Sequence, residues 1–234
     1  MKKYFVVGDV HAFWVHWEDA LDQTGFDVDD PDHILVSLGD LLDRGEDPVA
    51  CLEHVNALPK NRKILVRGNH EDLLEECLVR QDFWRRDVAN GTASTVAKLC
   101  GKRDWESVEQ ADYEVARSHP ALTRYLADLV DFAEVGDYVF VHGRIPSGID
   151  WREGDWYRAR WQNGMERWAA GERLAGKTVV CGHWHTSWGH CFLEGKGSEF
   201  GESADFSPFA KDGILAVDGC TAYSHVVNCV VLEV

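Results

Sequence analysis

Six short apolar segments that end in glycine constrain the fold of this chain more than any other feature. The segments are YFVVG (4–8), ILVSLG (34–39), KILVRG (63–68), YVFVHG (138–143), TVVCG (178–182) and ILAVDG (214–219). Short apolar runs bounded by glycine are typical of buried β-strands. At or beside each glycine lies a polar residue that could bind a metal ion. The pattern therefore predicts strands that all end in the same kind of polar side chain.

Helical patterns separate the first three of these segments. Apolar residues between Phe13 and Leu21 recur at steps of three and four, and Gly25 can end a helix there. Asp47 followed by Pro48 is a favourable start for a second helix over VACLEHVNAL. This alternation of strand and helix predicts parallel strands joined by crossover helices. Ligands gather at the carboxyl edge of such a sheet, so we expect the functional site at that edge.

The remainder of the chain is predicted to complete a single domain over residues 1–234, because it contains neither a repeat nor a linker. Residues 72–134 form a mostly helical insertion in this interpretation, with helices over DWESVEQADYEVARS (104–118) and ALTRYLADLVDFAEV (121–135). Residues 145–176 carry four tryptophans and several arginines, and we expect this segment near the mouth of the site. The tail VVNCVVLEV (226–234) is predicted to be the last strand of a hairpin.

Charge argues against some classes of binding partner, and cysteine content indicates the cellular compartment. The 40 acidic residues outnumber the 24 basic ones and give a formal charge of -16, which argues against a nucleic-acid groove or an anionic membrane surface as the main partner. The start, MKKYFVVGDV, has too short an apolar run for a signal peptide. The seven cysteines include no Cys-x-x-Cys pair and cannot all pair internally. We therefore expect a reduced, cytoplasmic protein and leave its oligomeric state open.

The polar residues at the strand ends form a set of candidate metal ligands. Their mixture of carboxylate, imidazole and amide groups suits first-row divalent metals. They are too many for one ion and suit two ions about 3.5–4 Å apart that share a carboxylate. Within GDLLDRG (39–45), Asp40 is the residue closest to the strand end and so the natural bridge. The candidate ligands are Asp9, His11, Asp40, Asn69, His142, His183 and His185.

Two pairs of candidate ligands are spaced two residues apart. In an extended chain, Asp9 and His11 would point the same way and could bind one ion. His183 and His185 have the same spacing, and Trp184 between them would then point away from the metals. Whether His185 is a ligand, a substrate contact or a residue that supports a ligand remains open at this point.

Five ordered motifs resemble the calcineurin-like metallophosphoesterase superfamily. They are GDVHA (8–12), GDLLDRG (39–45), GNHE (68–71), VHG (141–143) and GHWH (182–185). GDLLDRG and GNHE resemble the phosphoprotein phosphatase branch, including its small bacterial and phage serine/threonine phosphatases. The resemblance spans about residues 4–230 and implies an α/β sandwich of two mixed β-sheets flanked by helices, with a dimetal site at the strand ends.

The resemblance also implies how the candidate ligands are divided between the metals. It puts Asp9, His11 and Asp40 on the first metal. Asp40 bridges to the second metal, which Asn69, His142 and His183 complete. The wider superfamily often has Gly-His-x-His, as in GHWH, with the second histidine on the first metal, which is the role implied for His185. Mn is the metal that the family suggests, and Fe, Zn, Ni or Co could fill the same shell.

Catalytic and substrate-binding roles follow from the same resemblance. It makes His70 the general acid, oriented by Asp43, and Arg44 a clamp on phosphate oxygens. DWYRARW (155–161) resembles a W-x-R segment that supplies another phosphate-binding arginine, which assigns Arg158 with Arg160 in reserve. The chain departs from the family at Ala12, where glycine is usual. It also has His142-Gly143-Arg144 in place of His-Gly-Gly, so Arg144 either binds a phosphate or acidic substrate group or pairs with a carboxylate.

The expected function is hydrolysis of phosphate monoesters by a hydroxide that two metal ions activate. The substrate that the resemblance favours is phosphoserine or phosphothreonine in a protein. The alternative substrates are nucleotides, as for a symmetrical diadenosine tetraphosphate hydrolase or a cyclic-nucleotide phosphodiesterase. A noncatalytic scaffold is disfavoured because His70, Asp43 and Arg44 are all present.

Overall fold

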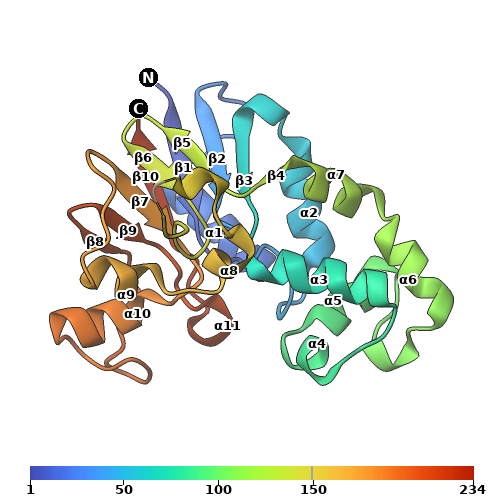
Figure 1. The fold of residues 1–234 in the computed structure, drawn as a ribbon. Coiled ribbons are helices and arrows are strands. Elements are labelled where there is room, and N and C mark those ends of the chain that lie inside the picture. The colour runs from blue at the N-terminus through green and yellow to red at the C-terminus, as the bar shows by residue number, and fades with distance from the viewer. Residues whose placement is uncertain (149) are drawn as a thin grey trace.

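Two five-stranded mixed β-sheets face one another in the structure, a computed structural model that describes residues 1–148 and 150–234 (Figure 1). The first sheet has the order β10 (Cys229–Glu233), β1 (Lys3–Val7), β2 (His33–Ser37), β3 (Lys63–Val66) and β4 (Leu129–Val130). The second has the order β5 (Ala133–Val135), β6 (Tyr138–Phe140), β7 (Thr178–Cys181), β9 (Ile214–Ala216) and β8 (Phe209–Lys211). The predicted α/β sandwich is confirmed, and all six predicted strands are present.

Alternation of side chains along the strands explains why two sheets pack together. Val6 of β1 and Val180 of β7 belong to the buried core between the sheets. The next residue of each strand faces the other way, so that Val7 packs toward the helices on the first sheet and Cys181 toward those on the second. Each sheet is therefore covered on both faces, which is why its strands are almost continuously apolar.

Parallel pairing brings the strand ends that carry polar residues to one edge. β1 pairs in parallel with β2, and β2 with β3, so that Val7 lies opposite Ser37 and Ser37 opposite Leu65. In the second sheet β6, β7 and β9 are likewise parallel neighbours. The carboxyl ends of strands from both sheets thus meet at a common edge, as the sequence predicts.

The two crossover helices of the first sheet begin and end as predicted. Helix α1 spans Trp14–Thr24, and Gly25 ends it in the left-handed conformation with φ 76°. Helix α2 spans Pro48–Ala57, with its proline in the first turn. The aromatic ring of Trp17 and the side chains of Leu21 and Leu52 are buried in the same core beneath the sheet.

Helices from residue 69 to residue 128 lie beside the first sheet, on the side away from the second sheet (Figure 1). They are α3 (Asn69–Arg80), α4 (Arg85–Ala89), α5 (Thr92–Leu99), α6 (Gln110–Arg117) and α7 (Pro120–Asp128). The helix predicted over 121–135 ends early, because Leu129 and Val130 pair with Leu65 and Val66 of β3. Only Gln110–Arg117 of the segment 104–118 is α-helical, preceded by a 3₁₀ turn at Trp105–Ser107.

Shorter helices cover the outer face of the second sheet and the site edge. They are α8 (Trp156–Arg160), α9 (Gly164–Ala169), α10 (Thr186–Trp188) and α11 (Thr221–Ser224), with a 3₁₀ turn at Trp151–Glu153 and a π turn at Gly189–Leu193. A further 3₁₀ turn at Lys60–Arg62 precedes β3 in the first sheet. The predicted C-terminal hairpin is wrong. Strand β10 pairs antiparallel with β1 at the opposite end of the chain, because this register places Val230 and Leu232 against the core between the sheets.

Within residues 1–148 and 150–234, no helix combines the length and the apolar character that a membrane crossing requires. All seven cysteines have free thiols in the structure.

Candidate active site

Two groups of metal-binding side chains share one carboxylate at the common strand edge. The first group is His11, Asp40 and His70, and the second is Asp40, His142 and His183. Within each group the potential ligand atoms lie within 4.8 Å of one another. Asp40 follows β2 at the centre of the first sheet, so its carboxylate can reach the residues that follow β1, β3, β6 and β7. The residue predicted to bridge two metals is therefore the residue common to both groups.

Asp40 is surrounded by imidazoles. Its Oδ1 lies 3.4 Å from His142 Nε2, and its Oδ2 lies 3.9 Å from both His11 Nε2 and His70 Nε2. Burial alone would raise the pKa of Asp40, but these histidines together hold the pKa well below its usual range. Asp40 Oδ1 also accepts a hydrogen bond from the backbone N–H of His70. The carboxylate is thus ionised and fixed in orientation.

Backbone carbonyls orient two of the histidines toward Asp40. His142 Nδ1 donates to Leu38 O at 2.7 Å, and His11 Nδ1 contacts Leu42 O at 3.1 Å. In each case Nε2 points inward with its lone pair available, the arrangement typical of metal-binding histidines. His142 Nε2 also lies 2.9 Å from the Oδ1 atom of Asn69.

These inward-facing atoms fit a metal site because they are acceptors that face one another. The lone pairs of His142 Nε2, Asn69 Oδ1 and Asp40 Oδ1 converge, and a cation between them would relieve their repulsion. Burial and its neighbour His142 lower the pKa of His183 to about 3, so this imidazole is neutral, which is the form that binds metals. The donor set of imidazole, carboxylate and amide suits first-row divalent ions.

Asp9 lies beside this cluster but is in neither group. Its Oδ1 accepts a hydrogen bond from the backbone N–H of His183 at 2.9 Å. Burial and the nearby carboxylates of Asp218 and Asp40 raise the pKa of Asp9 well above its usual value. Asp218 itself is buried, and its Oδ1 accepts from the N–H of Cys220. Three buried carboxylates so close together would be stabilised by bound cations, which further supports a metal centre.

The backbone at the site is turned where the sequence analysis expected it to be extended. His11, Asp40 and His183 have φ values of 53°, 51° and 64°, and Ala12 has φ 59°. The condition under which Asp9 and His11, or His183 and His185, would point the same way is therefore not met. Residues other than glycine rarely adopt this left-handed backbone conformation, which costs about 1–3 kcal/mol for each residue. Ala12 has a β-carbon and therefore carries part of this strain.

His185 turns away from both groups. Its Nδ1 lies 2.9 Å from Ser187 Oγ and its Nε2 lies 3.4 Å from Glu199 Oε1, while its ring contacts Phe200. Trp184 packs against the outer core of the second sheet. The assignment of His185 as a ligand stays a prediction, and it would require the contact with Glu199 to break.

His70 and Asp43 form a buried pair next to the metal-binding groups. His70 Nδ1 donates to Asp43 Oδ2 at 2.8 Å, and Asp43 Oδ2 also accepts from Thr92 Oγ1. Burial would lower the pKa of His70, but the carboxylates of Asp40 and Asp43 overcome that effect and raise it above 6.5. The raised pKa favours the protonated imidazole, and the bond to Asp43 fixes its orientation with Nε2 facing the cluster, which suits a general acid.

Arg44 reaches the cluster from an exposed position. Its two terminal nitrogens lie 3.0 Å from His11 Nε2 and 3.1 Å from His70 Nε2. The guanidinium therefore stands between solvent and the shared carboxylate, where it can bind phosphate oxygens in pairs.

Glu71 is a functional residue that the sequence analysis did not identify. Its Oε2 accepts from the backbone N–H groups of Asp40 and Gly68, and its Oε1 from Leu41 N–H and Tyr125 O–H, at distances of 2.8–3.0 Å. These bonds hold the turns that carry Asp40 and His70. The signal was present in GNHE, whose glutamate lies three residues after the glycine that precedes helix α3 and accepts from its N–H, which is one half of a capping box.

Replacement of Glu71 with glutamine is expected to destabilise the protein, because an amide group cannot accept from donors on both sides. The loss of charged hydrogen bonds and the donors left unpaired should lower the free energy of unfolding by ~2–4 kcal/mol. Urea denaturation measures this change. The matched control is Glu53→Gln on the exposed face of α2, which should shift the free energy by less than ~0.5 kcal/mol. Equal unfolding midpoints for the two variants would contradict the role of Glu71.

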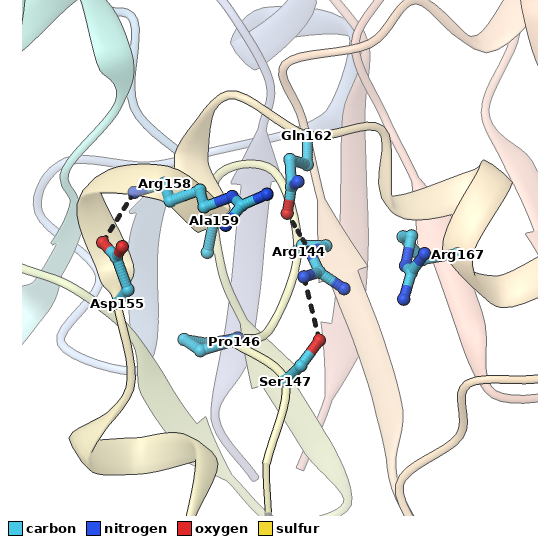
Figure 2. Close-up of a pocket in the computed structure, with 8 residues that line it drawn as sticks. All are labelled: Arg144, Pro146, Ser147, Asp155, Arg158, Ala159, Gln162 and Arg167. Atoms are coloured by element: carbon cyan, nitrogen blue, oxygen red, sulfur yellow. Dashed lines mark hydrogen bonds between the residues drawn. The ribbon is translucent and has the colours of Figure 1, made fainter.

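Two of the three predicted substrate arginines, Arg144 and Arg158, line a pocket apart from the metal-binding groups, whereas Arg44 contacts them. Arg144 and Arg158 line a cavity of about 370 Å³ together with Arg167, Ser147, Asp155 and Gln162, among other residues (Figure 2). We call this cavity the arginine pocket. None of the residues of the two metal-binding groups lines it. Arg160, the reserve candidate, is buried and pairs with Asp72 and Asp131, so its guanidinium is already occupied by carboxylates.

Comparison with known proteins gives matches to one family. A family model described as calcineurin-like phosphoesterase matches residues 2–212. A symmetrical bis(5'-nucleosyl)-tetraphosphatase from Glaesserella parasuis serovar 5 (strain SH0165) is 39% identical over 67 residues, which are 29% of this chain and 24% of that protein. A serine/threonine-protein phosphatase 1 from Salmonella typhimurium (strain LT2) is 39% identical over 72 residues, 31% of each chain. The matches thus span a quarter to a third of the length of these relatives.

Solved structures share the fold. A protein provisionally described as a diadenosine tetraphosphatase has a TM-score of 0.61 and 17% identity, with 99% of this chain and 90% of that chain covered. A cold-active protein-tyrosine phosphatase from a psychrophilic Shewanella species has a TM-score of 0.58 and 17% identity, with 100% of this chain and 76% of that chain covered. At this identity the likeness concerns the fold alone.

Proposed function

The chain belongs to the calcineurin-like phosphoesterase family, and we propose that it is a metal-dependent phosphomonoesterase that acts on phosphoserine or phosphothreonine in proteins. The observation that carries the hydrolase function is the convergence of two metal-binding groups on Asp40, next to the pair of His70 and Asp43. The motifs GDLLDRG and GNHE support the protein phosphatase branch, as does the local match to the Salmonella serine/threonine-protein phosphatase.

Two metal ions bound at this edge, Mn in our proposal, would lower the pKa of a water molecule toward ~7 and so supply hydroxide at neutral pH. His11, His142 and His183 would hold them with Asp40, Asn69 and Asp9. Arg44 would bind the oxygens of the phosphoryl group and offset the charge that develops on them. His70 would give its Nε2 proton to the departing serine or threonine oxygen, while Asp43 holds the imidazole in place.

A nucleotide hydrolase is the second candidate. The Glaesserella relative, a symmetrical bis(5'-nucleosyl)-tetraphosphatase, matches this chain over one segment. The arginine pocket could accommodate further phosphate groups. A dinucleoside polyphosphate, with several phosphates in a row, is the substrate class that this pocket would suit.

A comparison of substrates under Mn tests the proposal. We expect the highest kcat/KM with singly phosphorylated serine or threonine peptides, measurable turnover of p-nitrophenyl phosphate, and little turnover of bis-p-nitrophenyl phosphate. Higher kcat/KM for a dinucleoside polyphosphate than for the phosphopeptides would reject the protein phosphatase in favour of the nucleotide hydrolase. Absence of both bound metal and turnover would instead indicate a noncatalytic scaffold.

A further inference from the structure

The arginine pocket is the place where positive charge gathers on an otherwise acidic chain. Arg144, Arg158 and Arg167 line it, and Asp155 is the only carboxylate that does so in residues 1–148 and 150–234. The protein as a whole has a formal charge of -16. The arginine pocket has a volume of about 370 Å³, which lies within the range of small-molecule sites, ~300–1,000 Å³.

Arg144 is held rigidly in this pocket. Its Nε donates to Gln162 Oε1, its NH1 to Glu172 Oε2 at 3.0 Å, and its NH2 to Ser147 Oγ at 3.0 Å. A guanidinium has five N–H groups, so two of them remain available after these bonds. The side chain is therefore already ordered before a ligand binds, so that binding costs little side-chain entropy.

The other two arginines have hydrogen-bonding capacity to spare. The backbone N–H of Arg158 donates to Asp155, but no partner of the Arg158 guanidinium is found in the part of the chain that the structure describes. Figure 2 shows this side chain pointing toward Gln162. Arg167 shares the carboxylate of Glu172 with Arg144, and its buried Nε has no partner among the described residues. One glutamate thus serves two arginines.

A second cavity adjoins the arginine pocket and lies near the catalytic edge. It also measures about 370 Å³ and shares Gln162 and Arg167 with the arginine pocket. The rest of its lining is Trp161, Trp184, Trp188, Asn163 and one carboxylate, that of Glu166. The ring of Trp161 lies 6.4 Å from the ring of His183, which belongs to the metal-binding group. The tryptophan-lined cavity therefore lies between His183 and the arginine pocket, with Trp161 on the side of His183.

We propose that the arginine pocket is a second phosphate subsite, which binds a phosphate group of the substrate other than the one that is hydrolysed. Three guanidinium groups with unused planar donors match the oxygens of a phosphate dianion. Because the pocket lies beyond the tryptophan-lined cavity, the second phosphate must be separated from the reacting one by a spacer. The inference rests on the proposed function, since it assumes that a phosphoester is hydrolysed at the metal-binding groups.

Two variants with opposite expected effects test the subsite. In the metal-loaded full chain, isothermal titration with inorganic phosphate should show a site that Arg167→Gln weakens by ~10-fold or more, because a charged donor is lost. Glu172→Gln should strengthen the same site by ~3-fold or more, because it removes a competing negative charge. A purely structural role for the Arg167–Glu172 pair would give no such opposite effects. The control is Arg124→Gln, an exposed arginine of α7, which should leave phosphate binding unchanged.

Kinetics decide whether the bound phosphate belongs to the substrate. Arg167→Gln should leave kcat and KM for p-nitrophenyl phosphate within ~2-fold of the wild type. It should raise KM by ~10-fold for a substrate with a second phosphate. Peptides with two phosphoserines at varied spacing and a dinucleoside tetraphosphate are the two probes, and the one whose KM rises identifies the source of the second phosphate.

The subsite and the proposed function fail separately in this design. Identical phosphate binding by the wild type, Arg167→Gln and Glu172→Gln would overturn the subsite. An unchanged KM of Arg167→Gln for both the diphosphorylated peptides and the dinucleoside tetraphosphate would also overturn it. Phosphate binding that depends on Arg167, in a protein that turns over none of the phosphoesters, would support the pocket as a phosphate site and reject the hydrolase.

Discussion

Replacement of Asp40 with asparagine is expected to lower turnover by about 10³-fold and to release at least one metal ion per chain. Asp40 is the residue common to both metal-binding groups, and four histidines stabilise its ionised form. An amide offers one neutral acceptor in place of two charged ones, so neither group keeps its full set of ligands. Stabilisation of transition-state charge by metal ions contributes several kcal/mol, and each ~1.4 kcal/mol corresponds to a factor of ten.

Metal analysis by mass spectrometry, together with kcat on p-nitrophenyl phosphate, measures both effects. The matched control is Asp218→Asn, which removes the charge of another buried carboxylate beside Asp9. Asparagine can still accept the hydrogen bond from Cys220 N–H, so this variant should retain both ions. If Asp40→Asn kept two ions and more than a tenth of the activity, Asp40 would not bridge the metals.

The variant His70→Asn is expected to cut turnover of an alkyl phosphate ester by at least ~100-fold while metal content stays intact. General acid catalysis contributes ~10²–10⁴ in rate. The geometry also places His70 within the first metal-binding group, so the two possible roles give different results. Loss of an ion in His70→Asn would show that the imidazole is a ligand, and near wild-type turnover would exclude it as the acid.

The leaving group provides an internal control for this prediction. An alkoxide needs a proton as it departs, whereas p-nitrophenolate is stable without one, so p-nitrophenyl phosphate should lose much less rate than the alkyl ester. The variant Asp43→Asn should move the alkaline limb of the rate profile to lower pH. A general acid acts only below its pKa, and Asp43 is one of the two carboxylates that raise the pKa of His70.

Six strands of the sandwich could be predicted because each of them repeats one local pattern. A buried apolar run followed by glycine needs no knowledge of distant residues, and six such runs were sufficient to place the edge that carries the site. Strands β4, β5 and β8 were not predicted, because a charged residue interrupts or directly follows their few apolar residues. The partner of β10 was predicted wrongly, because pairing with β1 depends on the core between the sheets and not on the nearest strand in sequence.

In the candidate site, too, residues that follow local motifs could be predicted, whereas contacts with residues distant in sequence could not. Asp40, His142 and His183 converge as the ordered motifs predict, since parallel strand ends must meet at one edge. Glu71 was missed, because a glutamate in the first turn of a helix usually faces solvent and only the fold reveals the donors around it. The positions of Arg144 and Arg158 depend on how residues 145–176 fold across the second sheet, for which the sequence has no periodic pattern.

The metal-binding residues come from both sheets, and this affects the stability of the folded protein. Asp9, His11, Asp40 and Asn69 follow strands of the first sheet, whereas His142 and His183 follow strands of the second. Bound ions would therefore act as removable cross-links between the two layers. By mass action, a hundredfold excess of metal over its Kd stabilises the folded chain by about 2.7 kcal/mol per site. The lifetime of this protein should then rise and fall with the supply of metal around it.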